Sequence, residues 1–432
     1  MNIHVVQQGE TITSIAKHYG ITVERLLLDN DIAYPYNLVV GQSILIVYPT
    51  ITYTVQEGDT LKGIADSYQI SVLQMLRNNP FLSDRDYLFP GDSLVIRYGD
   101  NKKKIKTNGY ANPFINIGTL RKTLPYLTYL SIFGYTVNEN GEINEPDDEE
   151  LIQMAKDYQV APIMLVSTLS YQGVGSAEAA YKILYNEDKV NRYIDNILDI
   201  LRRKGLYGVS FIFSFMYSEN VDVYSSFTEK VAERLNREGY TVITSLPPMT
   251  EIEADRITFE RIDYTRIGIY ANQTVVMNYS WGHNPGPPMP AASIYMLRLF
   301  IDYLITQIAV DKMIIGLPIF GYGWQLPYII GKTEANALTY ESAITLALDT
   351  GSEIYFDEVS QNPYYEFVEN RAGIPIKYIV WFVDVRSIDA LLGLLAEYNS
   401  SGIAVWNIMT FFQQMWLLIN SQYEIETILP EA

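Results

Sequence analysis

The chain has 432 residues, of which 48% are hydrophobic and 19% are charged, a composition typical of folded domains and unlike that of disordered chains. Its formal net charge of −19 disfavours nucleic acid and anionic membrane surfaces as partners. The chain contains no cysteine and only three scattered histidines, which excludes disulfides and thiol catalysis and leaves no pattern for a metal site; we therefore expect no metal and no cofactor.

The N-terminal residues do not look like a targeting segment. A strand-like stretch at residues 3–6 follows Met1 almost directly, without a basic region and an apolar core, so we expect no signal peptide. The most apolar long stretch, residues 295–310, is interrupted by Arg298 and Asp302 and is too short to span a bilayer.

An internal repeat occupies residues 3–97. Gly9 aligns with Gly58, and the four apolar positions that follow recur at the spacing of one helix face: Ile12, Ile15, Ala16 and Tyr19 in the first copy, and Leu61, Ile64, Ala65 and Tyr68 in the second. A second helical segment and a closing strand, "GQSILIV" or "GDSLVIR", complete each copy. Each copy is therefore predicted to fold as strand–helix–helix–strand.

This pattern resembles the LysM module, through "YTVQEGDTLKGIADSY" and the closing "GDSLVI". The resemblance implies two modules, at residues 1–48 and 51–98, that bind glycans containing N-acetylglucosamine, such as peptidoglycan or chitin. It also implies a groove between the loop after the first strand and the loop after the second helix. The implied groove residues are Gly9, Glu10, Thr11, Ile12, Asn30 and Asp31 in the first copy, and Gly58, Asp59, Thr60, Leu61, Asn79 and Pro80 in the second. A purely local role of the glycines and threonines, in the turn and in the helix cap, is the alternative.

Beyond a polar linker at residues 99–104, short apolar strands alternate with helical segments. The predicted strands are Ile105–Ala111, Tyr129–Tyr135, Pro162–Thr168, Gly208–Phe213, Tyr240–Leu246, Thr274–Tyr279, Met313–Pro318 and Ile403–Asn407. Eight such units predict an α/β fold, a (β/α)8 TIM barrel over residues 105–425. The stretch at about 322–377 is longer than one unit and predicts a small inserted α+β subdomain.

Residues 105 to about 420 resemble glycoside hydrolase family 18, through "PYLTYLSIFGY", "VVMNYSWGHNPGPP", "IIGLPIFGYGWQLPY" and "GIAVWNI". The arrangement of two LysM modules before the barrel is similar to the branch of that family found in bacterial spores, which acts on cortex peptidoglycan. The resemblance implies substrate-assisted hydrolysis, in which the acetamido oxygen of the sugar attacks its own anomeric carbon.

The fourth strand of that family carries the acid and its partner in a motif close to GxNxDFE. This chain reads "GVSFIFSF", so Ile212 stands at the Asp position and Ser214 at the Glu position, and no Asp or Glu occurs from 204 to 218. Because neither side chain can donate the proton that the leaving group needs, we expect a barrel without catalytic activity. An active enzyme whose acid has moved to Glu219 or Asp222 is the alternative.

The resemblance leaves the sugar-binding aromatics at the mouth of the barrel, namely Tyr135, Tyr279, Trp281 and Trp406. It favours a glycan-binding protein of the spore envelope, between cortex and coat, with other envelope proteins as further partners. A structural coat protein whose barrel binds protein and no sugar stays open as a third reading, and a cytoplasmic location stays open as well.

Overall fold

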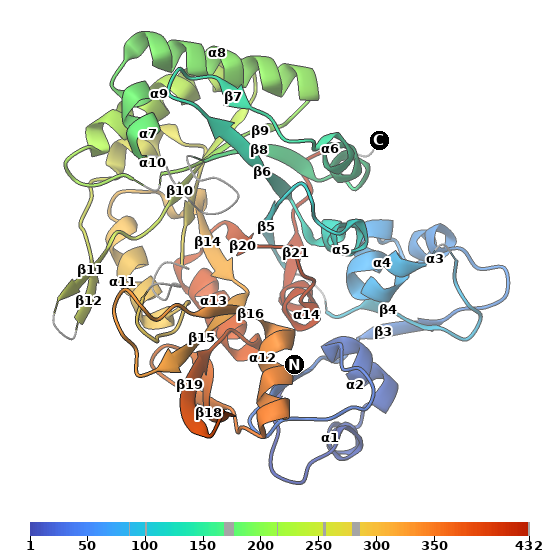
Figure 1. The fold of residues 1–432 in the computed structure, drawn as a ribbon. Helices are drawn as coiled ribbons and strands as arrows, with labels where there is room; N and C mark the ends of the chain where they lie inside the picture. Colours follow the sequence, from blue (N-terminus) through green and yellow to red (C-terminus); the bar gives the residue numbers. More distant parts are fainter. Residues whose placement is uncertain are drawn as a thin grey trace.

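The computed structural model describes residues 1–85, 87–99, 102–167, 177–213, 215–253, 256–278 and 286–430. Figure 1 shows two small N-terminal units packed against one side of a larger α/β unit. The chain thus builds the two repeats and the barrel that its sequence predicts.

Each repeat folds as a two-stranded antiparallel sheet beside two helices. The first contains β1 (Asn2–Val5), α1 (Ile12–Tyr19), α2 (Val23–Asn30) and β2 (Ser43–Ile46). The second contains β3 (Ile51–Thr54), α3 (Leu61–Ser67), α4 (Val72–Asn78), the 3-10 helix η1 (Pro80–Asp84) and β4 (Ser93–Arg97). The apolar helix faces predicted by the spacing form the core of each repeat, with Ile15 and Ala16 in the first and Ile64 and Ala65 in the second.

In the described part of the chain, eight parallel strands close a barrel, and each predicted strand is present. They are β5 (Lys103–Ala111), β6 (Tyr129–Val137), β8 (Ala161–Ser167), β9 (Gly208–Ile212), β10 (Thr241–Leu246), β13 (Gln273–Val276), β14 (Met313–Pro318) and β20 (Gly402–Trp406). Each of these eight strands pairs with the next, and β20 pairs with β5. Every barrel strand therefore has a neighbouring barrel strand on both sides. The fold is therefore a TIM barrel, as predicted.

Helices surround this barrel. They are α5 (Ile117–Thr123), α6 (Glu149–Asp157), α7 (Ala177–Leu184), α8 (Glu187–Lys204), α9 (Val221–Arg237), α10 (Thr265–Tyr270), α11 (Ile294–Leu304), α13 (Val385–Tyr398) and α14 (Gln413–Gln422). The shorter elements are η2 (Leu124–Tyr126), β7 (Ile143–Asn144), η3 (Val310–Lys312), β21 (Tyr423–Ile425) and a hairpin of β11 (Thr250–Glu253) and β12 (Arg256–Phe259). Among the described residues, no helix is both long and apolar enough to cross a membrane.

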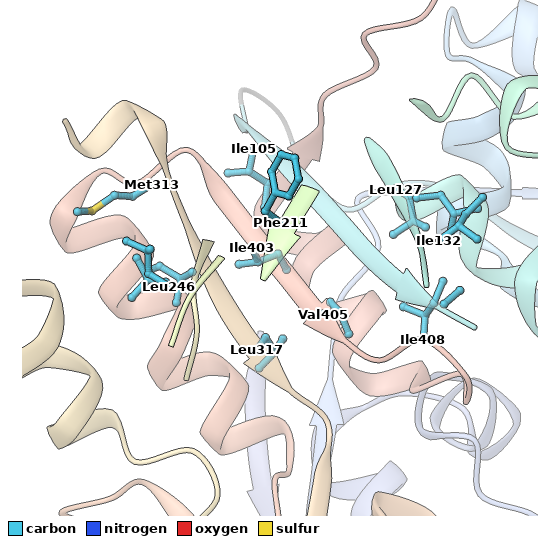
Figure 2. Close-up of a cluster of buried hydrophobic side chains, with 14 of the residues drawn as sticks. Ile105, Leu127, Ile132, Phe211, Leu246, Met313, Leu317, Ile403, Val405 and Ile408 are labelled. Atoms are coloured by element: carbon cyan, nitrogen blue, oxygen red, sulfur yellow. The ribbon is translucent and has the colours of Figure 1, made fainter. Parts of the chain in front are cut away.

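The main core lies between the barrel strands and the helices around them. Figure 2 shows part of this core, with Phe211 of β9, Ile403 and Val405 of β20, and Leu317 of β14. Alternate residues of the same strands point inward and form a second buried cluster, to which Ile212 and Ala404 belong. This alternation follows from the two-residue period of a strand, and it brings the inner side chains of all eight strands together.

Residues 320–381, which are described without a gap, form a five-stranded antiparallel sheet with one helix between β14 and α13. Its elements are β15 (Phe320–Leu326), β16 (Asn336–Thr339), α12 (Tyr340–Thr350), β17 (Tyr355–Asp357), β18 (Asn362–Arg371) and β19 (Ile374–Trp381). We refer to residues 320–381 as the inserted subdomain. Figure 1 shows α12 beside the first repeat.

The first repeat is fixed to the barrel by buried hydrogen bonds. The Ser43 hydroxyl donates to Asp384 Oδ2 at 2.8 Å, and Asp384 also caps α13 and pairs with Arg386 at 2.7 Å. Gln414 Nε2 donates to Asn30 Oδ1 at 2.7 Å and to the Ser43 carbonyl at 3.1 Å. Asp384, the residue before α13, thus joins the first repeat to the barrel.

The second repeat rests on the other end of α14 and on η2. Asn420 Nδ2 donates to Asn78 Oδ1 at 2.8 Å, and the Tyr126 hydroxyl donates to the Arg77 carbonyl at 2.7 Å. Arg77 is 4% exposed and its guanidinium donates to the Pro125 carbonyl; burial lowers the pKa of Arg77 to about 10. Both repeats thus share α14 as their support.

Candidate active site and glycan-binding modules

The mouth of the barrel, at the carboxyl ends of its strands, has an aromatic floor. Trp406 ends β20 and is half-buried; its ring lies 5.1 Å from that of Tyr110 and 6.1 Å from that of Phe133, measured between centroids. Tyr110 is fully buried, and its hydroxyl lies 3.3 Å from Ser245 Oγ, while burial raises the pKa of Tyr110 to about 12. The floor is therefore uncharged near neutral pH, and Trp406 offers a ring on which the C–H face of a sugar can stack.

Ile212, at the predicted motif position, lies in this same inner layer and is 6% exposed. It contributes an apolar contact at the position where the family motif has an aspartate. Ser214 lies outside the described residues, as do Tyr279 and Trp281, so their predicted places at the mouth stay predictions.

Tyr135 differs from its expected place at the mouth. Its side chain is fully buried in the outer core, and its hydroxyl donates to Asp148 Oδ2 at 2.5 Å. Asp148 in turn pairs with Lys204 at 2.5 Å. The pairing of β6 with β8 shifts register between Ile132 and Tyr135, which ends the inward alternation and turns Tyr135 away from the mouth.

Carboxylates follow β9 in the chain. Glu219 lies on the loop after β9 and Asp222 in the first turn of α9, and both are exposed. Glu260, which follows β12, reaches the same loop: its Oε1 accepts a hydrogen bond from Ser218 N at 3.0 Å and another from the Ser218 hydroxyl. The sequence analysis did not single out Glu260, because no local pattern of residues indicates its contact with Ser218, 42 positions earlier in the chain.

The first loops of the two repeats have the same construction. Gly9 and Gly58 adopt positive φ angles of 84° and 90°, and Thr11 and Thr60 cap the following helices. Glu10 Oε2 accepts from Gln7 N, and Asp59 Oδ2 accepts from Gln56 N, each at 2.7 Å. The Gln7 amide, together with His4, holds the pKa of Glu10 below its usual value. These residues shape the turn and cap the helix, as the alternative reading states, and their glycan contacts stay a prediction.

The second-loop residues Asn30 and Asn79 are buried and hold the fold of each repeat. Asn30 Nδ2 donates to the Leu26 and Leu45 carbonyls at 2.9 Å each, and its Oδ1 accepts from Leu45 N at 2.7 Å. Asn79 makes the same three bonds in the second repeat. Of the other predicted groove residues, Asp31 is exposed, whereas Ile12 and Pro80 are buried and Leu61 is half-buried.

Among the described residues, no group of three or more histidine, aspartate or glutamate side chains is arranged to hold a metal ion.

The sequence matches Glycosyl hydrolases family 18 over residues 100–410 and the LysM domain over residues 4–47 and 53–97. The chain belongs to glycosyl hydrolase family 18 and carries two LysM domains. The two domain types together imply binding of glycans that contain N-acetylglucosamine, such as peptidoglycan.

Relatives share this whole arrangement. The chain is 33% identical to the cortical fragment-lytic enzyme of Bacillus subtilis strain 168, over 98% of this chain and 99% of that protein. It is 30% identical to the putative sporulation-specific glycosylase YdhD of the same organism, over 97% and 98%. The crystal structure of the spore cortex-lytic enzyme SleL from Bacillus megaterium QM B1551 superposes with a TM-score of 0.80 at 30% identity, covering 99% of both chains.

These relatives overturn one expectation. The replacement of the acid motif by Ile212 and Ser214 predicted a chain that is not an enzyme, but relatives that match over nearly the full length are named as lytic enzymes. The prediction of an inactive barrel was therefore wrong. The expectation gave most weight to the strand motif and too little to carboxylates outside it, such as Glu219, Asp222 and Glu260.

Proposed function

We propose that this protein is a family 18 glycosidase that hydrolyses the N-acetylglucosamine-containing glycan of spore cortex peptidoglycan, and that it works in the spore cortex region. The observation that carries the proposal is the match of both LysM domains and the barrel, in one alignment, to a cortical fragment-lytic enzyme. The aromatic floor around Trp406 supports it, because a sugar ring can stack there.

The reaction is substrate-assisted. The acetamido oxygen of the sugar bound over Trp406 forms a bond to the anomeric carbon, the glycosidic C–O bond breaks, and an acid donates a proton to the leaving oxygen. Water then opens the resulting oxazoline ring and returns a proton to the conjugate base. Since residues 204–218 contain no carboxylic acid, the proton donor comes from outside this segment, and Glu219, Asp222 and Glu260 are the candidates.

The two LysM domains hold the enzyme on its polymer. Two weak sites on one rigid body convert the second binding event into an intramolecular one, which raises the overall affinity without a new contact. The predicted groove residues Glu10, Thr11, Asp59 and Thr60 belong to this part of the proposal.

The test is the release of new reducing ends from purified spore cortex fragments. We expect release by the unaltered chain, and a loss of about 10²- to 10⁴-fold in one of the variants Glu219→Gln, Asp222→Asn or Glu260→Gln, since general acid catalysis contributes that much. Glu233→Gln is the matched control, because Glu233 lies near the C-terminal end of α9, whose first turn carries Asp222.

No release by the unaltered chain, at enzyme concentrations that would reveal a slow reaction, contradicts the proposed activity. Release that persists at full rate in all three variants would keep the activity but refute the three candidate acids.

A further inference from the structure

A groove of about 810 Å³ lies between the second LysM domain and β21. One of its walls comes from α4 and the end of β4, and the other comes from Lys102, Lys104 and β21 with the residues that follow it. Its described lining contains none of the predicted LysM groove residues. We call it the domain groove. Its volume falls within the roughly 300–1,000 Å³ of clefts that bind small ligands.

The described lining of the domain groove carries more positive than negative charge. Its cations are Arg77, Arg97, Lys102 and Lys104, and its anions are Glu424 and Glu426. Glu424 pairs with Lys104 at 3.4 Å, and both side chains are exposed, so this pair contributes little and can open. In a chain with a net charge of −19, such a group of cations favours an anionic ligand.

Arg77 places a buried charge at this groove. The residue is 4% exposed, and arginine is almost never buried without a charged partner. Among the described residues, no carboxylate pairs with it: its Nε donates to the Pro125 carbonyl, and its Nη1 donates to Gln74 Oε1 at 3.5 Å. Both acceptors are neutral, so the described part of the chain leaves the charge of the guanidinium uncompensated, and a buried charge is costly in that state.

The guanidinium keeps a donor for a ligand. Its Nη2 makes no hydrogen bond with any described residue, and it does not belong to the enclosed side-chain atoms that lack a partner. A planar carboxylate can accept from Nη1 and Nη2 together, which is the geometry that arginine favours. Burial lowers the pKa of Arg77 to about 10, so the guanidinium is still charged at neutral pH.

We propose that the domain groove binds a carboxylate of the peptide side chains that peptidoglycan carries, with Arg77 as its partner. The source of the carboxylate rests on the proposed function, but the site is separate from the barrel mouth and from the predicted LysM grooves. The second LysM domain thus contacts the peptide part of the polymer as well as its sugars. Because Arg77 is buried, added salt screens this contact much less than it screens the repulsion between the acidic chain and the polymer.

The chain has no cysteine, so a single introduced thiol reports on this groove alone. Thr427 is exposed and lines the groove, and Thr427→Cys carrying a trifluoromethyl tag is the probe. We expect a saturable fluorine shift with the dipeptide N-acetyl-alanyl-glutamate and none with its diamide, which lacks both carboxylates. The same tag on Val359→Cys, an exposed position of the inserted subdomain, should not respond. N-acetylmuramic acid, whose carboxylate belongs to the sugar, is a separate arm and should bind more weakly than the dipeptide.

Arg77→Met in the tagged chain removes the charge and all donors of the side chain while it keeps an apolar side chain of similar reach. We expect the dissociation constant for the dipeptide to rise about 10- to 100-fold, as for a lost hydrogen bond to a charged group. Urea unfolding checks that the variant is folded. Lys62→Gln removes an exposed positive charge from the same domain outside the groove and is the matched control.

Glu424→Gln tests the site without a change at Arg77. The Glu424 carboxylate is exposed, and its charge acts on Arg77, whose pKa it raises against the effect of burial. Because this carboxylate competes with the ligand, we expect its removal to lower the dissociation constant about two- to fivefold. A purely structural role of Arg77 predicts no change. Glu57→Gln, at an exposed carboxylate of the second LysM domain outside the groove, is the control.

The absence of a saturable shift, equal shifts with the dipeptide and its diamide, or an unchanged constant in Glu424→Gln or in folded Arg77→Met would each overturn the site. Tighter binding of N-acetylmuramic acid than of the dipeptide would overturn the peptide as the source of the carboxylate. This readout does not depend on hydrolysis. A chain that cuts cortex fragments without a tag response refutes only the groove site, and a tag response without cutting refutes only the proposed activity.

Discussion

The ion pair of Arg25 and Asp29 on α2 of the first LysM domain illustrates how burial competes with pairing. Asp29 is 3% exposed and pairs with Arg25 at 2.5 Å, and Arg25 also donates to the Tyr98 hydroxyl. Burial outweighs the Arg25 charge and raises the pKa of Asp29 to about 6. Since the folded carboxyl holds its proton to a higher pH than the unfolded one, the stability it contributes is present below about pH 4 and is lost as the pH rises through 6.

We predict that Asp29→Asn removes this dependence. Between pH 4.5 and 7.5, the unfolding free energy of the unaltered chain should fall relative to that of the variant by about 2 kcal/mol, because the variant shares every other titrating group but has no Asp29 carboxyl to lose a proton. Urea unfolding of both chains at the two pH values measures the change. If the difference in unfolding free energy between the two chains is the same at both pH values, the Arg25 pairing, rather than burial, sets the pKa of Asp29.

At the scale of elements, α14 and the loop before β2 decide where the LysM domains sit. α14 contacts both domains, through Gln414 at its start and Asn420 near its end. The loop before β2 approaches the inserted subdomain so closely that a Cβ on Gly41 would lie 1.9 Å from the Ile354 carbonyl oxygen. Gly91 holds the equivalent turn of the second domain, where a Cβ would meet no atom within 4 Å.

This pair offers a matched test of the contact between domains. Gly41 and Gly91 have positive φ angles of 85° and 96°, so Gly41→Ala and Gly91→Ala share the backbone strain. Only Gly41→Ala also displaces Ile354, and it should lower the unfolding free energy by about 1–3 kcal/mol more, the usual cost of overpacking. Urea unfolding compares the two variants. Equal losses would mean that the first domain moves away from the inserted subdomain at no cost.

At the scale of the whole molecule, the charge of −19 affects how the protein approaches a charged glycan. Peptidoglycan carries carboxylates, so the two repel each other at long range, and binding relies on hydrogen bonds and ring stacking at short range. Chitin carries almost no charge and lacks this repulsion.

We therefore predict that added salt strengthens the binding of this protein to peptidoglycan, whereas salt weakens binding between partners of opposite charge. Raising sodium chloride from 50 to 500 mM shortens the screening length from roughly 14 Å to 4 Å, and it should increase the amount of protein that sediments with cortex peptidoglycan by a few-fold. Sedimentation with chitin, the neutral control, should change little. A fall in peptidoglycan binding with salt would instead reveal a cationic contact with the polymer.

Much of the architecture could be predicted because it depends on local patterns. The helix faces of the two repeats, the capping threonines Thr11 and Thr60, and all eight barrel strands follow from spacing and alternation. Trp406 lies at the end of β20, within one residue of the predicted strand end, and its role in sugar binding stays a prediction. The position of Tyr135 could not be predicted, because the alternation of residues in the sequence does not reveal the register shift within β6.

By itself, the sequence determined the LysM repeats, the barrel, the family and the absence of a carboxylate between 204 and 218, since each depends on neighbours in the chain. Only the tertiary structure decided which distant groups meet. Gln414 reaches Asn30 across 384 positions, Glu260 reaches Ser218, and α12 and the first LysM domain line a common cavity. Such contacts depend on how whole elements pack together, and no local pattern of residues predicts that packing.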